Sequence, residues 1–306
     1  MKVLVSGASG FLGNVLRRQL EAGGHDVWTF GAPGWAVVPE SRHFHIEDIS
    51  SPEAHAQMLR QTRPDWIFHL AGVSRAAGIR EAYMVNSVWG GTLLLAAGEA
   101  CPDSRVMLIG SAAEYGPQQT NEHSKFGYAL DEQTECRPVG LYGISKLAQT
   151  LHALSLAGKQ DIVVARPFNI VGPGMPESLA LGGFVKRIKE LPAGGGVLPT
   201  GPLGGIRDFI DVRDCAATLI ALMQTAASAG KVINVCSEEA TLMRDLLALV
   251  IDRAGCPVSV QEAPSSSKES DVYVGAATML RALGIRLPGA DLPAIVDAMM
   301  NGRMGG

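Results

Sequence analysis

The chain begins with a short apolar run, a glycine-rich turn and a helical pattern in immediate succession. Residues 2–6 read KVLVS, residues 7–13 read GASGFLG, and residues 14–22 alternate apolar and polar side chains with helical period. Glycines at this spacing let the backbone approach a pyrophosphate, and the N-terminus of the following helix offers free N–H groups and the positive end of its dipole. We therefore predict a nucleotide-binding turn at residues 7–13; the alternative is a tight turn without a ligand.

Strand-like and helical patterns then alternate along the chain. Apolar runs occur at residues 65–71, 105–110, 161–165 and 231–235, and helical patterns at 51–61, 83–99, 142–157 and 214–225. The apolar runs have no polar alternate face, which is typical of interior strands in a parallel sheet covered on both sides. The alternation predicts an α/β fold with a doubly wound parallel sheet.

A second strand is expected at residues 25–30, and its end bears on the choice of cofactor. In a dinucleotide-binding fold an acidic residue there holds the adenosine ribose hydroxyls. Residues 31–33 are Gly-Ala-Pro, so no carboxylate would repel a 2′-phosphate, and NADP is favoured over NAD. Arg42 is a distant basic candidate for that phosphate. Asp48 could accept a hydrogen bond from the adenine amino group, or cap the helix expected from residue 51.

Charge and composition narrow the classes of function. The 306 residues carry 26 basic and 30 acidic side chains, for a net charge of −4, without a basic run, so nucleic acid is not an expected partner. No apolar run reaches the roughly 20 residues of a membrane span, and the N-terminus lacks a secretory leader pattern. The five scattered cysteines lack metal-ligand spacing and suit a reducing compartment. We expect a cytoplasmic protein without a metal site.

Two of the expected helices have no charged face. Residues 85–97 and 147–156 are apolar or small nearly all round. A helix that is apolar on every side is buried on every side, and a sheet can cover only one of those sides. We predict a homodimer that forms through helices 85–97 and 142–157. The alternative is that the substrate-binding segments of the same chain cover these helices.

Tyr142 and Lys146 are four residues apart, which places them on one face of a helix. An ammonium beside a phenol stabilises the phenolate, so we expect Lys146 to lower the pKa of Tyr142 and to allow proton transfer at neutral pH. Such pairs also arise by chance on solvated helix faces. Ser111 directly follows the apolar run 105–110, at the strand end where open α/β sheets carry functional residues. Its hydroxyl could bind a substrate carbonyl, or cap a short turn.

Two further segments carry polar groups that suit a phosphorylated ligand. A Pro/Gly-rich turn, RPFNIVGPG at residues 166–174, follows the third long apolar run, and RDFIDVRD stands at residues 207–214. Arginine suits bidentate recognition of a diphosphate. The alternative for the second segment is a cluster of surface ion pairs.

Taken together, the motifs resemble those of a known family, the extended short-chain dehydrogenases/reductases, which include NAD-dependent nucleotide-sugar epimerases, dehydratases and reductases. The residues that carry the resemblance are GASGFLG at 7–13, HLAG at 69–72, Asn86, SAAEYG at 111–116, YGISK at 142–146, RPFNIVGPG at 166–174, RDFIDVRD at 207–214 and NVCS at 234–237. Within the family, RPFN…GPG, the helical segment from Phe184 and RDF…DVRD are most similar to GDP-6-deoxy-D-mannose (rhamnose) reductases. Those enzymes reduce a 4-keto-6-deoxy sugar nucleotide with NAD(P)H.

The resemblance implies a Rossmann domain, residues 1–167 with about 207–236, and a smaller, discontinuous C-terminal substrate-binding domain, residues 168–206 with 237–306. It implies that Tyr142 is the general acid/base, that Lys146 tunes it and binds ribose, and that Ser111 polarises the carbonyl. The residues implied to bind NADP or NAD are Gly7, Ser9, Gly10, Phe11, Leu12, Gly13, Asp48, Ile49, Leu70, Ala71, Gly72, Asn86, Tyr142, Lys146 and Pro167. Those implied to bind the nucleotide sugar are Ser111, Ala112, Asn169, Arg207 and Lys268, the last in a place where these reductases often have an arginine.

One departure from the family pattern bears on the reaction. The family's 4,6-dehydratases carry an Asp-Glu or Ser-Glu pair directly after the position of Ser111, whereas this chain has Ala112 and Ala113. Glu114 stands one residue later and, in an extended segment, points to the opposite side. Dehydration is therefore disfavoured, and the resemblance implies reduction of a nucleotide-linked 4-keto-6-deoxyhexose. The alternatives are a nucleotide-sugar 4-epimerase that keeps NAD bound, and a non-catalytic nucleotide-binding protein.

Overall fold

The larger part of the molecule is built on a seven-stranded sheet. The computed structural model describes residues 1–32, 39–117, 129–264 and 272–302. The strand order is β10-β6-β5-β4-β1-β2-β3, and every neighbouring pair is parallel. The strands are β1 Lys2–Ser6, β2 Asp26–Gly31, β3 His43–His45, β4 Trp66–His69, β5 Arg105–Ile109, β6 Ile162–Pro167 and β10 Val232–Val235. The expected doubly wound parallel sheet is confirmed.

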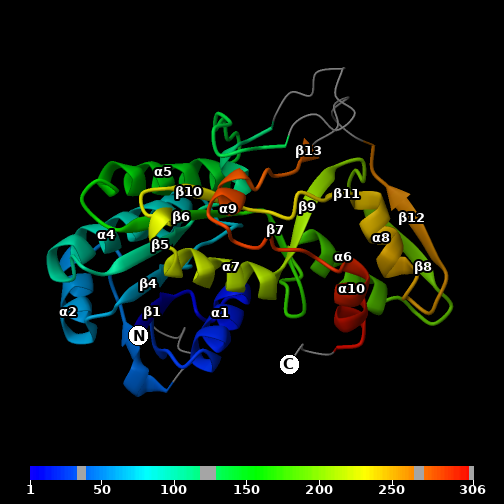
Figure 1. Cartoon of the computed structure of the whole chain (residues 1–306). Coiled ribbons are helices and arrows are strands. Elements are labelled where there is room, and N and C mark those ends of the chain that lie inside the picture. The colour runs from blue at the N-terminus through cyan, green and yellow to red at the C-terminus, as the bar shows by residue number, and fades with distance from the viewer. Residues whose placement is uncertain (33–38, 118–128, 265–271, 303–306) are drawn as a thin grey trace.

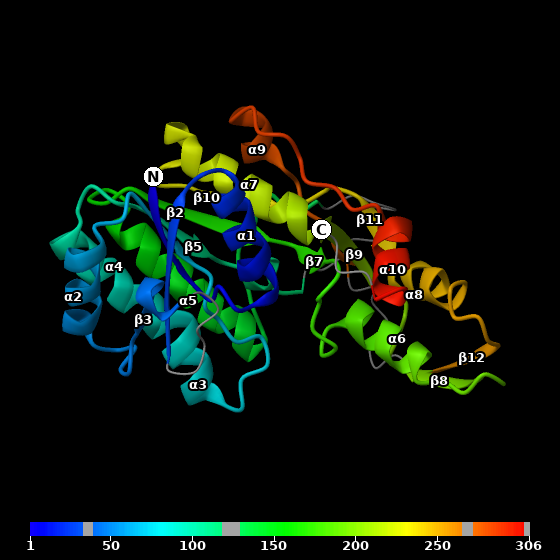
Figure 2. The same cartoon turned by 90° about the horizontal axis from the view of Figure 1, so that it is seen from below.

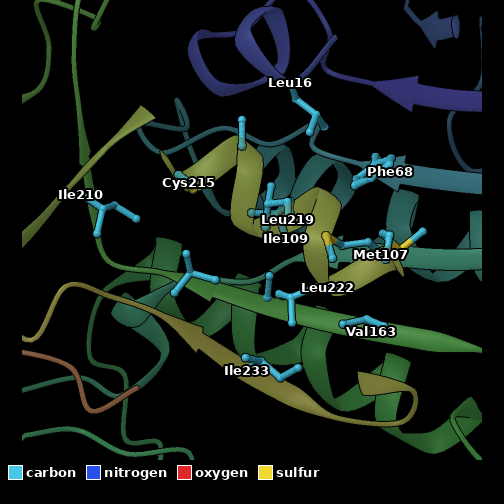
Figure 3. Close-up of a cluster of buried hydrophobic side chains, with 14 of the residues drawn as sticks. Leu16, Phe68, Met107, Ile109, Val163, Ile210, Cys215, Leu219, Leu222 and Ile233 are labelled. Atoms are coloured by element: carbon cyan, nitrogen blue, oxygen red, sulfur yellow. The ribbon is translucent and has the colours of Figure 1, made fainter. Parts of the chain in front are cut away.

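Helices cover both faces of this sheet (Figure 2). On one face lie α1 Phe11–Ala22 and α7 Val212–Gln224, and on the other lie α2 Pro52–Thr62, α4 Trp89–Ala100 and α5 Leu141–Leu156. Strand residues alternate between two buried clusters, so Val3 faces α1 and α7 while Leu4 faces α2 and α4. Figure 3 shows Leu16 of α1 and Leu219 of α7 packed towards side chains of β4, β5, β6 and β10. Burial on both faces explains why these strands are apolar throughout.

The smaller part lies beside the large sheet and has its own apolar cluster (Figure 1). Its four-stranded sheet has the order β11-β9-β13, with β7 also paired to β9, and β12 pairs separately with β8. These strands are β7 Asn169–Val171, β8 Gly196–Thr200, β9 Ile206–Asp211, β11 Ala240–Leu242, β12 Val258–Glu262 and β13 Val272–Tyr273. The helices of this part are α6 Ala180–Lys189, α8 Met243–Ile251 and α10 Leu292–Met300, while the short α9 Thr278–Ala282 packs near β10. Within residues 207–236, β9 therefore belongs to the smaller sheet, whereas α7 and β10 belong to the large part.

The helix expected at residues 83–99 begins earlier and contains an irregular turn. The helical stretch starts with α3 Ile79–Tyr83, passes through a π-helical turn at Met84–Val88 and continues as α4. A π turn inside a helix widens it by one residue and often marks a functional site. None of the helices in the described ranges has the length and apolar composition needed to cross a lipid bilayer.

Candidate active site

A cavity of ≈ 420 Å³ lies where the large sheet meets the smaller part. The segments that line it are the turn after β5, the start of α5, the end of β6 and strands β7, β9 and β13. Its described lining includes six residues expected in the site, namely Ser111, Ala112, Tyr142, Pro167, Asn169 and Arg207. It also includes residues that were not among the expected binding or catalytic residues, namely Ala113, Gly116, Pro117, Val139, Gly140, Gly143, Phe168 and Tyr273. The cavity therefore opens at the C-terminal ends of the strands, as expected for this sheet type.

Ser111 and Tyr142 meet in this cavity because α5 begins very close to the turn after β5. Ser111 is the N-cap of a short 3-10 helix, Ala112–Glu114, and its Oγ accepts a hydrogen bond from the Ala113 N–H at 3.1 Å. A Cβ on Gly143 would lie only 2.3 Å from the Ala113 carbonyl oxygen, so this approach requires glycine. Ser111 also shares a side-chain hydrogen bond with Tyr142. Both expectations for Ser111, a capping role and a place beside the cavity, are compatible with this arrangement.

Lys146 lies behind Tyr142, buried with only 3% of its surface exposed. Its Nζ donates to the carbonyl oxygen of Ile109, the last residue of β5, at 2.8 Å and to Oε1 of Gln149 at 3.3 Å. Gln149 donates to the same carbonyl at 3.2 Å. Burial lowers the pKa of Lys146 to about 8, although the charge of Glu114 opposes that change. The lysine is therefore held against the end of β5 and titrates close to neutral pH.

The expectation that Lys146 lowers the pKa of Tyr142 is wrong for this structure. The pKa of Tyr142 is raised, first by burial and also by the negative charge of Glu114, while the hydrogen bond to Ser111 opposes the rise. Lys146 is not among the groups that shift the pKa of the phenol, and its ammonium donates to the Ile109 carbonyl. Tyr142 therefore keeps its proton at neutral pH, which suits a proton donor more than a proton acceptor.

The glycine turn and the loop after β4 form one continuous surface at the N-terminus of α1. Gly7 has a φ of +67°, and a Cβ there would lie 2.7 Å from the Ala71 nitrogen. The Oγ of Ser6 accepts from the Ala71 N–H at 3.1 Å and so joins the two loops. No side chain caps α1, and no acidic residue lies in its first turn. Uncapped N–H groups and exposed backbone at Gly10 fit the pyrophosphate of a dinucleotide.

Asn86 supports this surface from behind. It lies in the π-helical turn and is fully buried. Its Oδ1 accepts from the Val73 N–H at 2.8 Å, and its Nδ2 donates to the Val73 carbonyl at 2.9 Å and to Ser145 Oγ at 3.0 Å. The amide thus ties the loop that carries Leu70, Ala71 and Gly72 to helix α5, which carries the tyrosine and lysine.

Two expectations about the adenosine end need correction. Asp48 does not cap α2, because the cap is Ser51, which accepts from the Ala54 N–H at 3.2 Å, while Asp48 accepts from Ser50. A nitrogen of the Arg42 guanidinium lies 3.5 Å from Oδ1 of Asp26, the first residue of β2, so Arg42 is at the N-terminal ends of the strands, whereas the cofactor turn follows the C-terminal end of β1. Asp48 and Ile49 follow β3, and their contact with adenine stays a prediction. Residues 33–38, which follow β2, are outside the described residues.

The segments expected to bind phosphates converge on β9. Nδ2 of Asn169 donates to the Asp208 carbonyl at 2.9 Å, and the guanidinium of Arg207 lies 5.1 Å from the centre of the Tyr273 ring. The carboxylate of Asp208 is fully buried and accepts four hydrogen bonds, from Ser237 N and Oγ, Glu238 N and Gly275 N. The segment 207–214 is thus largely structural, with an ion pair of Arg213 and Asp211 at its end. Lys268 lies outside the described residues.

The segment that carries Glu114 is helical and not extended, so the strand-like alternation that would turn its side chain to the opposite side does not apply. Its side chain is fully buried, its Oε1 accepts from the Ser111 N–H at 2.8 Å, and its Oε2 accepts from Nε of Arg166 at 2.8 Å. Neither the role of Arg166 nor its ion pair with Glu114 was expected from the sequence. Two signals were available: the spacing from Ser111 to Glu114 fits a capping box, and an arginine inside an apolar strand requires a buried partner.

Comparison with known proteins identifies the class to which this site belongs. Residues 3–236 match the model of the NAD dependent epimerase/dehydratase family. The chain belongs to this family. The family resemblance that the motifs indicated is thereby confirmed, and the protein is an NAD(P)-dependent oxidoreductase or epimerase that acts on nucleotide sugars.

Relatives within the epimerase/dehydratase family include two curated enzymes. The chain is 31% identical over 272 residues to dTDP-6-deoxy-L-talose 4-dehydrogenase (NAD(P)(+)) of Kitasatospora kifunensis, covering 86% of this chain and 82% of that protein. It is 28% identical over 283 residues to GDP-6-deoxy-D-mannose reductase of Pseudomonas aeruginosa, covering 88% and 86%. The solved structure of RMD from Pseudomonas aeruginosa complexed with NADPH has a TM-score of 0.82 at 24% identity, over 99% of this chain and 98% of that chain, and shows the shared fold.

Proposed function

We propose that the protein reduces the 4-keto group of a nucleotide-linked 4-keto-6-deoxyhexose with NAD(P)H. The observation that carries the proposal is the wall of the cavity beside Ser111 and Tyr142. The adjoining positions there are Ala112 and Ala113, and the one carboxylate of this turn, Glu114, is buried against Arg166. The site therefore offers a proton donor for carbonyl reduction but, among the described residues of that wall, no carboxylate to abstract a proton from the sugar ring.

In this mechanism the hydroxyls of Ser111 and Tyr142 bind the carbonyl oxygen of the sugar. Bound NAD(P)H supplies the hydride. Tyr142 donates its proton to the oxygen as negative charge develops there, because its raised pKa keeps the phenol protonated. Such positioned donors act mainly in the transition state, and removing one typically costs about 3 kcal/mol. Lys146, which is charged below its pKa of about 8, then returns a proton to the phenolate left on Tyr142 and regains one from solvent.

In the proposed site, the larger part of the fold binds the cofactor and the smaller part binds the nucleotide sugar. Residues 1–167 with about 207–236 hold the cofactor, with Gly7, Gly10 and Gly13 at the pyrophosphate. Ser9, Phe11 and Leu12 complete the turn, Asp48 and Ile49 contact adenine, Leu70, Ala71, Gly72 and Pro167 flank the nicotinamide half, and Lys146 binds ribose. Residues 168–206 with 237–306, together with Arg207 of β9, hold the nucleotide, with Asn169 and Arg207 at the phosphates and Lys268 as a further candidate from the sequence. NADP is the proposed cofactor because β2 ends at Gly31 and is followed by Ala32, so no carboxylate stands at its end.

The second candidate is a 4-epimerase, which uses the same three catalytic residues and returns the hydride to the opposite face. The relatives named above, a 4-dehydrogenase and a 4-keto sugar reductase, favour net redox chemistry at C4. A non-catalytic nucleotide-binding role accounts poorly for a protonated phenol paired with a serine hydroxyl. Cofactor analysis separates the first two candidates: a reductase consumes added NAD(P)H, whereas an epimerase purifies with tightly held NAD and consumes none.

The direct test is consumption of NADPH and NADH with 4-keto-6-deoxy sugars linked to GDP, dTDP, UDP and CDP. Steady oxidation of either cofactor with at least one of these sugars supports the proposal. Interconversion of sugars at C4 without net cofactor consumption would replace it by the epimerase. Absence of turnover with every keto sugar would overturn it.

Turnover should fall as the pH rises past about 8. Burial holds the pKa of Lys146 at about 8, below that of a free lysine. The lysine is therefore charged below that pH and loses its proton above it, and with that proton it loses its ability to reprotonate Tyr142 after each turnover. Measured as kcat/KM against pH, the profile should be level near pH 7 and decline above 8. A profile that stays level far above pH 8 would contradict this role of Lys146.

The exposed leucines of α4 and α5 support the proposed homodimer. Leu95, Leu151 and Leu154 are 52%, 57% and 41% exposed, so the described substrate-binding segments leave them uncovered. Large apolar side chains clustered on two helices are typical of a protein interface. We expect Leu151→Glu to convert a dimer into a monomer in analytical ultracentrifugation. Val197→Glu on β8 is the matched control, because Val197 is 58% exposed but lies outside these helices. A monomeric unaltered protein, or equal effects of both changes, would contradict the dimer.

A further inference from the structure

The buried ion pair of Glu114 and Arg166 adjoins Ser111, whose backbone N–H donates to Glu114. Glu114 is 0% exposed and Arg166 is 5% exposed. The two side chains come from different elements, the turn after β5 and strand β6, and the arginine also lies 4.9 Å from the centre of the Tyr115 ring. A Cβ on Gly110 would lie 2.4 Å from Oε1 of Glu114, so the chain keeps space for this carboxylate. Burying two charges costs considerable desolvation, and pairing offsets that cost only in part.

Each oxygen of the Glu114 carboxylate has a separate role. Oε1 accepts from the Ser111 N–H at 2.8 Å, and Oε2 accepts from Nε of Arg166 at 2.8 Å. The first contact closes the capping box of the turn and thereby fixes the backbone that presents the Ser111 hydroxyl. The second contact fixes the carboxylate itself, because Arg166 belongs to a buried strand of the sheet.

We propose that Glu114, held by Arg166, is a positioning residue for the reaction: it fixes Ser111 and places a negative charge beneath Tyr142 and Lys146. This inference rests on the proposed function, because it assigns roles relative to the proton donor of that reaction. It goes further in assigning a role to the one carboxylate of a turn whose positions 112 and 113 are both alanine.

The groups around Glu114 determine in which direction its charge shifts their pKa values. The titratable and charged groups that face it are Tyr142 and Lys146 from α5, Arg166 from β6, Tyr115 of the same turn and Cys136 of the following segment. Its charge raises the pKa of Tyr142 and that of Lys146. Both effects act in one direction: with the carboxylate in place, the phenol and the ammonium keep their protons to higher pH. Loss of the charge must therefore move both titrations to lower pH.

Glu114→Gln tests the charge separately from the contact. The amide keeps an acceptor for the Ser111 N–H but carries no charge. We expect the alkaline limb of kcat/KM to move down by about one pH unit, the order of shift that one nearby charge produces. The ultraviolet titration of the Tyr142 phenolate, read as the difference from a matched Tyr142→Phe protein, should move in the same direction. That titration needs no substrate, so it tests this inference even where the proposed reaction fails.

Three further variants make the outcome decisive. Glu114→Asp keeps the charge but shortens the side chain, so kcat should fall while the alkaline limb stays within a few tenths of a pH unit. Glu114→Gln/Arg166→Gln leaves no uncompensated charge in the core and replaces the single change if that variant folds poorly. It should show a smaller downward shift, because the positive charge of Arg166 is lost as well. Glu21→Gln, which removes the exposed partner of Arg17, is the control and should shift nothing. Unchanged pH limbs and an unchanged phenolate titration in both Gln variants would overturn the inference.

Discussion

Tyr142→Phe should lower turnover about a thousandfold, within the range expected for loss of a general acid, while NAD(P)H binds as before. The phenyl ring fills the same space, because only the hydroxyl that meets Ser111 is removed. The cofactor turn and the loop after β4 are held by other contacts, such as Ser6 to Ala71 and Asn86 to Val73. Stopped-flow and steady-state rates give the loss, and quenching of protein fluorescence by NADPH gives the affinity.

The matched control is Tyr83→Phe on α3, which removes a phenol hydroxyl from a residue outside the cavity lining. It should leave turnover unchanged. If Tyr142→Phe kept more than about a tenth of wild-type turnover, the loss would be smaller than general acid catalysis supplies, and the assigned role would be wrong. An equal loss in both variants would point to a general effect of hydroxyl removal on the fold.

Gly13→Ala should abolish cofactor binding and destabilise the protein, whereas Gly10→Ala should affect binding alone. A Cβ on Gly13 would lie 2.1 Å from the Gly7 carbonyl oxygen and 2.8 Å from the Gly7 carbonyl carbon, so the turn and α1 must separate. Overpacking of this kind costs roughly 3 kcal/mol of unfolding free energy. A Cβ on Gly10 meets only the Gly7 oxygen, at 3.1 Å, and the residue has ordinary extended backbone angles.

Thermal unfolding and NADPH titration of both glycine variants separate the two effects. Gly10→Ala should lower Tm little, because surface substitutions usually change stability by less than about 0.5 kcal/mol, yet weaken NADPH binding by placing a methyl group against the pyrophosphate. Gly13→Ala should lower both. Normal NADPH affinity in Gly10→Ala would show that the cofactor does not approach this turn, and the proposed cofactor site would be wrong.

Much of the large sheet can be predicted from the sequence. Strands such as β1, β5 and β6 are buried on both faces, so their residues must be apolar throughout, and that run is visible without a structure. The positions of Ser111 and Tyr142 can be predicted in the same way, since Ser111 closely follows the end of β5 and Tyr142 lies at the start of α5. The strands of the smaller part are harder to predict, because β13 has two residues and pairs with β9 across a long stretch of chain.

The electrostatics of the site could not be predicted from spacing alone. A separation of four residues places Lys146 near Tyr142, but it does not reveal that the ammonium binds the Ile109 carbonyl. The direction of Glu114 depends on whether its segment is extended or helical, and the capping box with Ser111 decides that. The helix-capping alternative for Asp48 and the expected place of Arg42 were wrong for a related reason: their partners, Ser50 and Asp26, are determined by local geometry rather than by residue type.

The most direct test of the account is the transfer of deuterium from NADPH labelled at both C4 positions to the sugar. The protein is incubated with the labelled cofactor and 4-keto-6-deoxyhexoses linked to GDP, dTDP, UDP and CDP, and the products are analysed by mass spectrometry and NMR. If the protein reduces the 4-keto group, one deuterium is expected at C4 of the product sugar for each cofactor oxidised, with at least one of the four nucleotides. A product that forms without deuterium and without cofactor oxidation, or no product from any of the four, would contradict the proposed reduction.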